Sequence, residues 1–344
     1  MMETYPLQAT IATEDRFLAG YAAGRNGAAL RDESSHGRIW LAGEDRIAFM
    51  QRLSTNEMRL SPGQGTVTIL TSPTARIIAV LTVQIHRDGL LLITGADQGP
   101  TVFMTLRSQI FFSDKVSLAG RGGALAQFGL YGPAAAAVLT GAGAGDLSDM
   151  ALFDWREVTL AGQLCTVQRI EGVGGDALTV FAPAPQAEAV RSELQAAGAV
   201  AISDDAFHVL RMEAGVPAAG IDLNEQVSPL EAGLRRFCND FKGCYTGQEI
   251  IARQITYDKV ANYLVGLRLS ALAVPGAAVM VDGRKVGWVS SAVQSIALDQ
   301  PIALAYLHRP NHEPGTEVIV QSAGAAIMAE VVALPFTSLD ASVD

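Results

Sequence analysis

The segment Lys-Gly-Cys-Tyr-Thr-Gly-Gln-Glu at 242–249 holds the residue of this chain best suited to reactive chemistry, Cys244. A thiol acts as a nucleophile or a ligand only as its thiolate, which a nearby lysine and a helix N-terminus both stabilise. Lys242 lies two positions away, and 248–253 predict the first turns of a short helix starting near Gly247. Cys244 is therefore a candidate working thiol. The alternative is that Cys244 is a small buried side chain in a turn.

The rest of the chain predicts the elements that must position this segment. Runs rich in Val, Ile, Thr and Leu, divided by Gly and Pro turns, predict strands at 38–41, 66–71, 76–86, 89–94, 115–119 and 125–131. A further strand pair is predicted at 157–170 and 178–181. Helical spacing of apolar residues predicts helices at 44–53, 100–109, 134–139, 188–197 and 204–215.

Strand groups alternate with helices in no regular strand–helix–strand rhythm, so the sequence predicts an α+β fold rather than a doubly wound parallel sheet. No Gly-x-Gly-x-x-Gly follows a predicted strand and no Walker loop is present, so neither route to nucleotide binding is supported.

From Asn262 onward the pattern changes to short strands separated by turns. These predicted strands are 264–269, 278–281, 285–291, 302–306, 317–321 and 326–333, with a strong hairpin signal at Asp282-Gly283. We therefore expect an α+β region at 1–257, built from two subdomains, followed by a small β-barrel domain at 258–344.

Composition limits the classes of partner and compartment. A chain of 344 residues is long enough for two or three domains, and its formal charge of −10 argues against nucleic acid as a partner. Three cysteines, Cys165, Cys238 and Cys244, show no disulfide-rich or zinc-ligand spacing, which indicates a reducing compartment. Residues 1–16 lack the pattern of a secretory signal, and Gly and Pro interrupt the apolar stretch 124–139. We expect a cytoplasmic protein with no membrane partner.

Several segments are similar to one known family. The motif at 242–249, followed by Ile-Ile-Ala-Arg, resembles the signature of the YgfZ/IBA57 proteins, the folate-binding iron–sulfur maturation branch of the glycine-cleavage T-protein superfamily. The likeness extends to residues 32–39, 43–45, 53–58, 210–217, 229–234, 287–291 and 302–307. The resemblance implies a T-protein-like multidomain fold around a central folate-sized channel, with a small C-terminal β-barrel.

The resemblance also implies tetrahydrofolate as the cofactor and reduced folate as a partner. A pterin needs carboxylates and amides at its edge, an aromatic or apolar wall, and a cation for its glutamate tail. The candidate cofactor-binding residues, besides Lys242, are Glu213, Glu231, Gln248 and Glu249 for the edge, Tyr245 for a wall, and Arg211 or Arg253 for the tail.

Three of these candidates have structural alternatives. Arg211 and Glu213 could form an ion pair on a helix surface or between domains. Glu231 could be an acidic charge at the start of a helix, because Pro229 suits a first turn.

The sequence predicts no metal site of its own. The five histidines are scattered, and no His-Glu-x-x-His pattern of metal ligands is present. Three cysteines cannot supply a four-cysteine cluster. If a transient iron–sulfur cluster is bound, Cys244 would be one ligand, and a partner protein or a small thiol would provide the others.

Two segments differ from the amine-transferring members of the superfamily. Those members carry acidic residues in a Gly-x-Ile-x-Asp-Asp-type run, where this chain has Ala79-Val80. Where T-proteins have a Gly-Glu pair for folate, this chain has Gly174-Gly175-Asp176. Apolar side chains cannot serve as the base or the cation stabiliser that methylene transfer requires.

The sequence thus supports three hypotheses. The first is a tetrahydrofolate-binding protein that assists iron–sulfur cluster assembly or repair in client enzymes, with Cys244 as the working thiol. The second is an enzyme, a tetrahydrofolate-dependent aminomethyl- or methyltransferase, with a carboxylate such as Glu213 or Glu249 replacing the lost one. The third is a binding module of the same fold that has lost its ligand.

Overall fold

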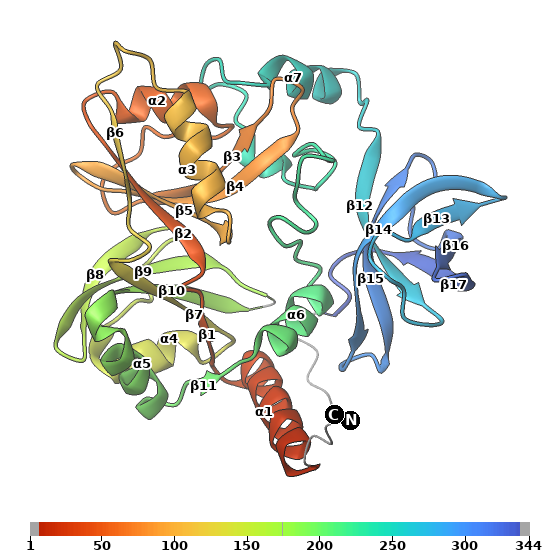
Figure 1. The fold of residues 1–344 in the computed structure, drawn as a ribbon, viewed down its shortest axis with the longest axis horizontal. Helices are drawn as coiled ribbons and strands as arrows, with labels where there is room; N and C mark the ends of the chain where they lie inside the picture. Colours follow the sequence, from red (N-terminus) through yellow and green to blue (C-terminus); the bar gives the residue numbers. More distant parts are fainter. Residues whose placement is uncertain (1–6, 174, 338–344) are drawn as a thin grey trace, which may run out of the picture.

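The computed structural model describes residues 7–173 and 175–337 and contains three β-structures (Figure 1). A five-stranded sheet has the order β3-β4-β5-β2-β6, a six-stranded sheet has the order β11-β1-β7-β10-β9-β8, and a closed barrel has the order β12-β15-β14-β13-β16-β17. Figure 1 shows the two sheets one above the other, with the barrel at their side. This architecture confirms the predicted α+β T-protein-like fold with a C-terminal barrel.

The five-stranded sheet is formed by strands rich in β-branched residues and Leu: β2 (His36–Ala42), β3 (Gly65–Thr71), β4 (Ile77–Ile85), β5 (Gly89–Ala96) and β6 (Ser117–Gly120). Two helices cover its outer face, α2 (Arg46–Leu53) and α3 (Gly99–Ser108). Their apolar sides supply Phe49, Met50 and Leu106, which pack on Leu41 and Leu81 of the sheet with no solvent exposure. Alternate residues of β4 therefore face this core, and the others face the opposite side of the sheet.

The six-stranded sheet contains β1 (Ala29–Asp32), β7 (Leu125–Tyr131), β8 (Trp155–Leu160), β9 (Gln163–Glu171), β10 (Asp176–Pro183) and β11 (Val200–Ala201). Its helices are α4 (Ala135–Leu139), which runs into the π-turn η1 (Thr140–Ala144), and α5 (Ala187–Ala196), preceded by the 3-10 turn η2 (Ala184–Gln186). The prediction of one strand at 157–170 was wrong. Ala161 and Gly162 have φ of 49° and 71°, and they turn the chain into the hairpin β8–β9.

The barrel contains six antiparallel strands, all of them predicted: β12 (Asn262–Leu269), β13 (Ala278–Val281), β14 (Arg284–Ser295), β15 (Gln300–His308), β16 (Glu317–Ser322) and β17 (Ala325–Val332). Asp282 and Gly283 join β13 to β14 with φ of 50° and 73°, as a two-residue hairpin turn requires. Its interior is filled by aliphatic side chains such as Leu267, Val289 and Val331, which are fully buried.

The remaining helices connect these units: α1 (Leu7–Asn26), α6 (Asp204–Glu213), the 3-10 turn η3 (Arg235–Phe237) and α7 (Gln248–Thr256). The helix α1 was not predicted, because its apolar residues do not keep to one face. Gly20 and Gly24 allow α1 to approach Ile202 and Leu210 so closely that a Cβ at either glycine would clash. In the described ranges 7–173 and 175–337, none of the helices is both long and apolar enough to cross a membrane.

Candidate functional site

A central cavity of about 930 Å³ lies where the two sheets face each other. Strands of both sheets line it, through residues of β4 and β5 on one side and of β7, β9 and β10 on the other. The segments 215–219 and 232–237 and the barrel residue Leu264 close it further. All three β-structures therefore meet at this one cavity.

Much of the cavity wall is apolar. Phe153, Phe181 and Phe237 bring aromatic rings to it, and Val80 and Ile93 bring aliphatic side chains. These side chains give a flat ring system surfaces to pack against.

The segment that lacks the expected acidic residues belongs to this wall. Val80 lines the cavity, whereas its neighbour Ala79 is buried in the core under α2 and α3. Gly175 also lines the cavity, but Gly174 and the side chain of Asp176 lie outside the described residues. Residues 79 and 80 thus contribute no carboxylate to the site.

One end of the cavity carries a cluster of polar side chains, Glu33, His36, Gln127 and Tyr131. The Tyr131 hydroxyl donates to Glu33 Oε1, and Gln127 Nε2 donates to Glu33 Oε2 at 3.0 Å. The same Gln127 nitrogen lies 3.4 Å from His36 Nδ1. Burial raises the pKa of Tyr131 well above its ordinary value and lowers the pKa of His36. Both groups are therefore neutral near pH 7.

Two guanidinium groups also reach the cavity. Arg236 pairs with Glu171 at 2.6 Å, and 59% of its side chain is exposed, which places it at the rim. Arg169 of β9 lines the cavity as well. The cation at the rim is thus already paired with a carboxylate of the cavity wall.

The signature motif lies outside this cavity. Cys244 and the preceding Gly243 are exposed to solvent, whereas Lys242 and Tyr245 are buried. The Lys242 ammonium donates to the Ser54 carbonyl and lies 5.3 Å from the centre of the Tyr245 ring. Burial lowers the pKa of Lys242 to about 8. The ammonium is held inside the protein while the thiol faces outward.

Tyr245 connects the motif to the cavity wall. Its side chain is buried in one apolar cluster with Leu234 and Phe237, both of which line the cavity. The backbone after Tyr245 is tied to the five-stranded sheet and to α2. Thr71 Oγ1 donates to the Thr246 carbonyl at 2.6 Å, and the Thr246 amide donates to the Arg52 carbonyl of α2 at 3.2 Å. One buried apolar cluster thus joins the residue after the thiol to the wall of the cavity.

Three further candidates lie on α7, which begins at Gln248 as expected. Glu249 and Arg253 are exposed on this helix, and Gln248 is half-buried at its first position. None of the three lines the central cavity.

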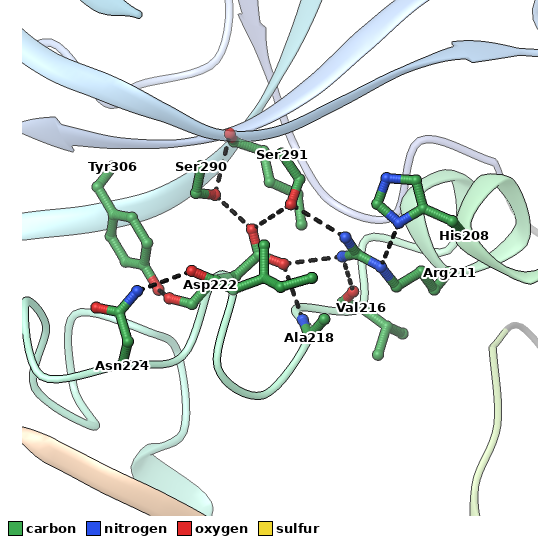
Figure 2. Close-up of polar contacts among 11 residues, drawn as sticks. His208, Arg211, Val216, Ala218, Asp222, Asn224, Ser290, Ser291 and Tyr306 are labelled. Carbon is green, nitrogen blue, oxygen red and sulfur yellow. Dashed lines mark hydrogen bonds and ion pairs between the residues drawn. The ribbon is translucent and has the colours of Figure 1, made fainter. Parts of the chain in front are cut away.

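Arg211 and its partner Asp222 form the centre of a buried polar network between α6 and the barrel (Figure 2). Asp222 Oδ2 accepts from Arg211 and from the Ala218 amide, both at 2.8 Å. Asp222 Oδ1 accepts from Ser290 at 2.6 Å and from Ser291 at 2.7 Å. Arg211 therefore joins domains, and it does so with Asp222 rather than with Glu213.

Glu213 makes a second junction between domains. One carboxylate oxygen accepts from Tyr21 at 2.7 Å and from Arg25 at 3.1 Å, both on α1. The other accepts from Ser295 of the barrel at 2.8 Å. Glu213 thus fastens α1, α6 and β14 together.

Glu231 is also committed to the structure. Its Oε2 accepts from Arg76 and from the Ser228 amide, both at 2.7 Å, and its Oε1 accepts from Asn262 at 2.7 Å. The alternative of a charge at a helix start was wrong, because Pro229 and its neighbours form turns instead of a helix.

None of the predicted site residues is among those that line the cavity. The polar residues that do line it were missed as site candidates, although two signals were available. Glu33 and His36 lie in a segment on which the family resemblance rests, and Gln127 is a polar residue inside an apolar strand. A buried polar side chain in such a strand requires a partner, and for that reason it marks a site.

The three thiols differ in access. Cys165 and Cys238 are buried, and burial raises the pKa of each to about 11. Cys244 is exposed. In the part of the chain that the structure describes, no group of three or more His, Cys, Asp and Glu side chains is placed to hold a metal ion.

Comparison with known proteins gives the same architecture. Residues 4–242 match the GCVT N-terminal domain, and residues 262–337 match the glycine cleavage T-protein C-terminal barrel domain. The glycine cleavage system aminomethyltransferase T of Bartonella henselae has the same fold, with a TM-score of 0.83 over 94% of this chain and 90% of that one at 22% identity.

Two sequence relatives cover most of the chain. A putative chloroplastic transferase of Arabidopsis thaliana is 32% identical over 307 residues, which are 89% of this chain and 71% of that protein. An aminomethyltransferase of Moorella thermoacetica is 31% identical over 320 residues, which are 91% of this chain and 87% of that protein. With both domains matched in order and relatives at this identity, the chain belongs to the glycine-cleavage T-protein family.

Proposed function

We propose that this protein binds a reduced folate in its central cavity and assists the assembly or repair of iron–sulfur clusters in client enzymes through Cys244. The observation that carries the proposal is the position of Cys244. Its thiol is exposed, and the adjacent Tyr245 packs against Leu234 and Phe237 of the cavity wall. A ligand in the cavity would stabilise this wall and, through Tyr245, the backbone that carries the thiol. The assignment to iron–sulfur clients comes from the resemblance of the 242–249 motif.

The cavity has the chemistry that a folate needs. Its volume of about 930 Å³ falls in the range of small-molecule sites. Phe153 and Phe237 offer surfaces to a flat ring, and Arg236 offers a cation to a glutamate tail. Gln127 is among the lining residues, and its buried side-chain oxygen has no hydrogen-bond partner among the described residues. When bound, a reduced folate would supply a flat heterocycle able to carry one-carbon units.

The wall at Val80 favours binding over transfer. A methylene transfer needs a base or an acidic group that stabilises a cation beside the reacting carbon. Val80 provides neither, and the family resemblance implies acidic residues at this position in the amine-transferring members. The folate would then serve to shape the protein, while the thiol engages the cluster or an oxidised adduct.

The test separates the thiol from the ligand. In cells that carry Cys244→Ser, the activity of iron–sulfur enzymes should fall, while Cys165→Ala, which alters a buried thiol, should leave it unchanged. The purified Cys244→Ser protein should still bind 5-formyltetrahydrofolate in a calorimetric titration. If the activity of the iron–sulfur enzymes is unchanged, Cys244 has no role in the mechanism. If the titration releases no heat, the protein does not bind folate.

A one-carbon transferase is the second candidate, favoured by the similarity to aminomethyltransferases. Glu213 and Glu249, which the sequence offered as substitutes for the lost acid, do not line the cavity, whereas Glu33 and Glu171 do. The protein should then form methylene- or methyl-tetrahydrofolate from an amine or sulfur donor, and Glu33→Gln or Glu171→Gln should abolish it. A negative result over a broad donor panel excludes this activity. A chain with neither folate binding nor an effect on cluster enzymes would be a ligand-free module of the same fold.

A further inference from the structure

We propose that a second cavity between the two sheets binds a planar aromatic monocarboxylate, with the ring between Trp40 and Phe181 and the carboxylate on Arg121. This second cavity has a volume of about 270 Å³. Sites of drug-sized ligands usually measure about 300–1,000 Å³, so the second cavity suits a molecule of one or two fused rings. Trp40 and Arg121 do not line the central cavity, so the site is independent of the proposed folate site.

One wall of the second cavity is a row of side chains on the five-stranded sheet. Leu91 is the cross-strand partner of Trp40 on one side and of Gln84 on the other. Cross-strand partners point to the same face of a sheet, and all three residues line the second cavity. The neighbours of Trp40 in the chain, Ile39 and Leu41, pack in the core under α2 and α3. The row therefore faces the six-stranded sheet.

The opposite wall is a row of side chains on the six-stranded sheet. Thr166 is the cross-strand partner of Phe181 on one side and of Glu157 on the other, and all three line the second cavity. Phe181 is 2% exposed and belongs to one apolar cluster with Leu91 and Trp40 of the first wall. The interior between the two rows is thus aromatic and aliphatic, which suits the faces of a flat ring.

Two buried glutamines lie between the second cavity and the central one. Gln84 lines the second cavity and Gln168 lines the central cavity. Gln84 Nε2 donates to Gln168 Oε1 at 3.2 Å, and neither side chain is exposed. A ligand in the second cavity therefore lies behind this pair and leaves the central cavity free.

Arg121 supplies a positive charge to the second cavity. It follows β6, and its guanidinium lies 5.9 Å from the centre of the Trp40 ring. The Arg121 side chain is exposed, and it forms no hydrogen bond or ion pair with any residue of 7–173 and 175–337. A guanidinium with free donors binds a carboxylate through two parallel hydrogen bonds. Arg121 is thus available to a ligand whose ring enters beside Trp40.

Glu157 restricts the ligand to one carboxylate. Arg121 precedes β7, whereas Glu157 is on β8, and β10 and β9 separate these two strands in the sheet. Three strand spacings amount to about 14 Å, so the two charges lie toward opposite ends of the second cavity. Glu157 is exposed and has no ion pair among the described residues. A second acidic group, at the end of the ligand away from Arg121, would be repelled by this carboxylate.

The test titrates the full-length protein with 2-naphthoate in a calorimeter. We expect binding, and Arg121→Met should weaken it at least about 10-fold, because the carboxylate loses its charged partner. Arg87→Met is the matched control, because Arg87 is also exposed and lines neither cavity. Its replacement should leave the affinity unchanged. An absence of 2-naphthoate binding, or an equal loss in both variants, would overturn the proposal.

Two further variants test the place and the orientation of the ligand. Ala124 is exposed and lines the second cavity, so Ala124→Trp should block the entrance and abolish binding. Naphthalene-2,6-dicarboxylate should bind more weakly than 2-naphthoate, and Glu157→Gln should remove this difference. Full affinity in Ala124→Trp would put the ligand elsewhere and overturn the site. A difference that persists in Glu157→Gln would overturn the orientation between Arg121 and Glu157.

Discussion

The Arg211 guanidinium donates to Asp222 at 2.8 Å, with 6% of the Arg211 side chain and none of the Asp222 side chain exposed. Asp222 also accepts hydrogen bonds from two serines of the barrel (Figure 2). It lies six residues after Val216, which lines the cavity. The Arg211–Asp222 ion pair therefore fixes the positions of α6, one wall of the cavity and the barrel relative to one another.

Arg211→Met should destabilise the protein by about 3–5 kcal/mol, because it leaves Asp222 charged and buried without its partner. Urea unfolding, followed by circular dichroism, measures the change. The control is Arg309→Met, which breaks the pair with Asp258, where 45% and 73% of the side chains are exposed. That change should cost far less, because solvent screens an exposed ion pair. Equal losses in the two variants would show that the buried pair has no special role.

Lys242 should make stability depend on pH in the alkaline range. Burial lowers its pKa to about 8 from an ordinary value of 10.5. Between these values the unfolded chain holds a proton that the folded protein has lost, so the contribution of Lys242 to folding becomes more favourable as the pH rises. The free energy of unfolding of the unmodified protein, compared with that of Lys242→Met at the same pH, should increase by on the order of 3 kcal/mol from pH 7 to pH 10.5.

Urea unfolding of both proteins across this range provides the measurement. Lys115→Met is the control, because it removes a lysine whose side chain is 70% exposed. A Lys242→Met difference that changes with pH no more than that of Lys115→Met would contradict the burial of the ammonium.

Iodoacetamide should modify one cysteine of the folded protein at pH 8, Cys244. Cys165 and Cys238 are buried, and their pKa values of about 11 leave little thiolate at this pH. Mass spectrometry of the intact chain should show one adduct, none for Cys244→Ala, and three for the unmodified protein in urea. Labelling of Cys238 in the folded state at a rate similar to that of Cys244 would refute this assignment of access.

His86 should titrate far below an ordinary histidine. Its ring stacks on Trp155 at 3.9 Å between centroids and meets the edge of Trp40 at 5.0 Å, and burial lowers its pKa to about 4. NMR of the imidazole protons should give a midpoint near pH 4. The pKa of His86 is lower in the folded protein than in the unfolded chain. As the pH falls from 6.5 toward 4, the unfolded chain therefore takes up a proton at His86 that the folded protein does not, and the free energy of unfolding decreases.

Removing one stacking partner tests the cause. Trp155→Leu should move the His86 midpoint upward, toward about 6.5, because water reaches the ring. Trp288→Leu, in the barrel, should leave the midpoint where it is. An unchanged midpoint in Trp155→Leu would show that burial between the two indoles is not the cause.

Local pattern predicted most of the secondary structure, because it depends on residues close in the chain. The six barrel strands and the hairpin at Asp282-Gly283 follow from alternation and turn chemistry alone. The helix α1 was not predicted, since its packing depends on Gly20 and Gly24 approaching segments almost 200 residues away. The hairpin at Ala161-Gly162 was not recognised because its turn interrupts a continuous run of strand-forming residues.

The sequence alone determined the α+β architecture, the C-terminal barrel, the glycine-cleavage T-protein superfamily, and the presence of an unusual cysteine motif. Only the tertiary structure decided which residues share a cavity. Arg211, Glu213 and Glu231 carry the charges that a ligand would require, yet each is paired with a group distant in the chain and holds the domains together. Charge and spacing cannot distinguish a partner within the protein from a ligand, because both are recognised by the same hydrogen bonds.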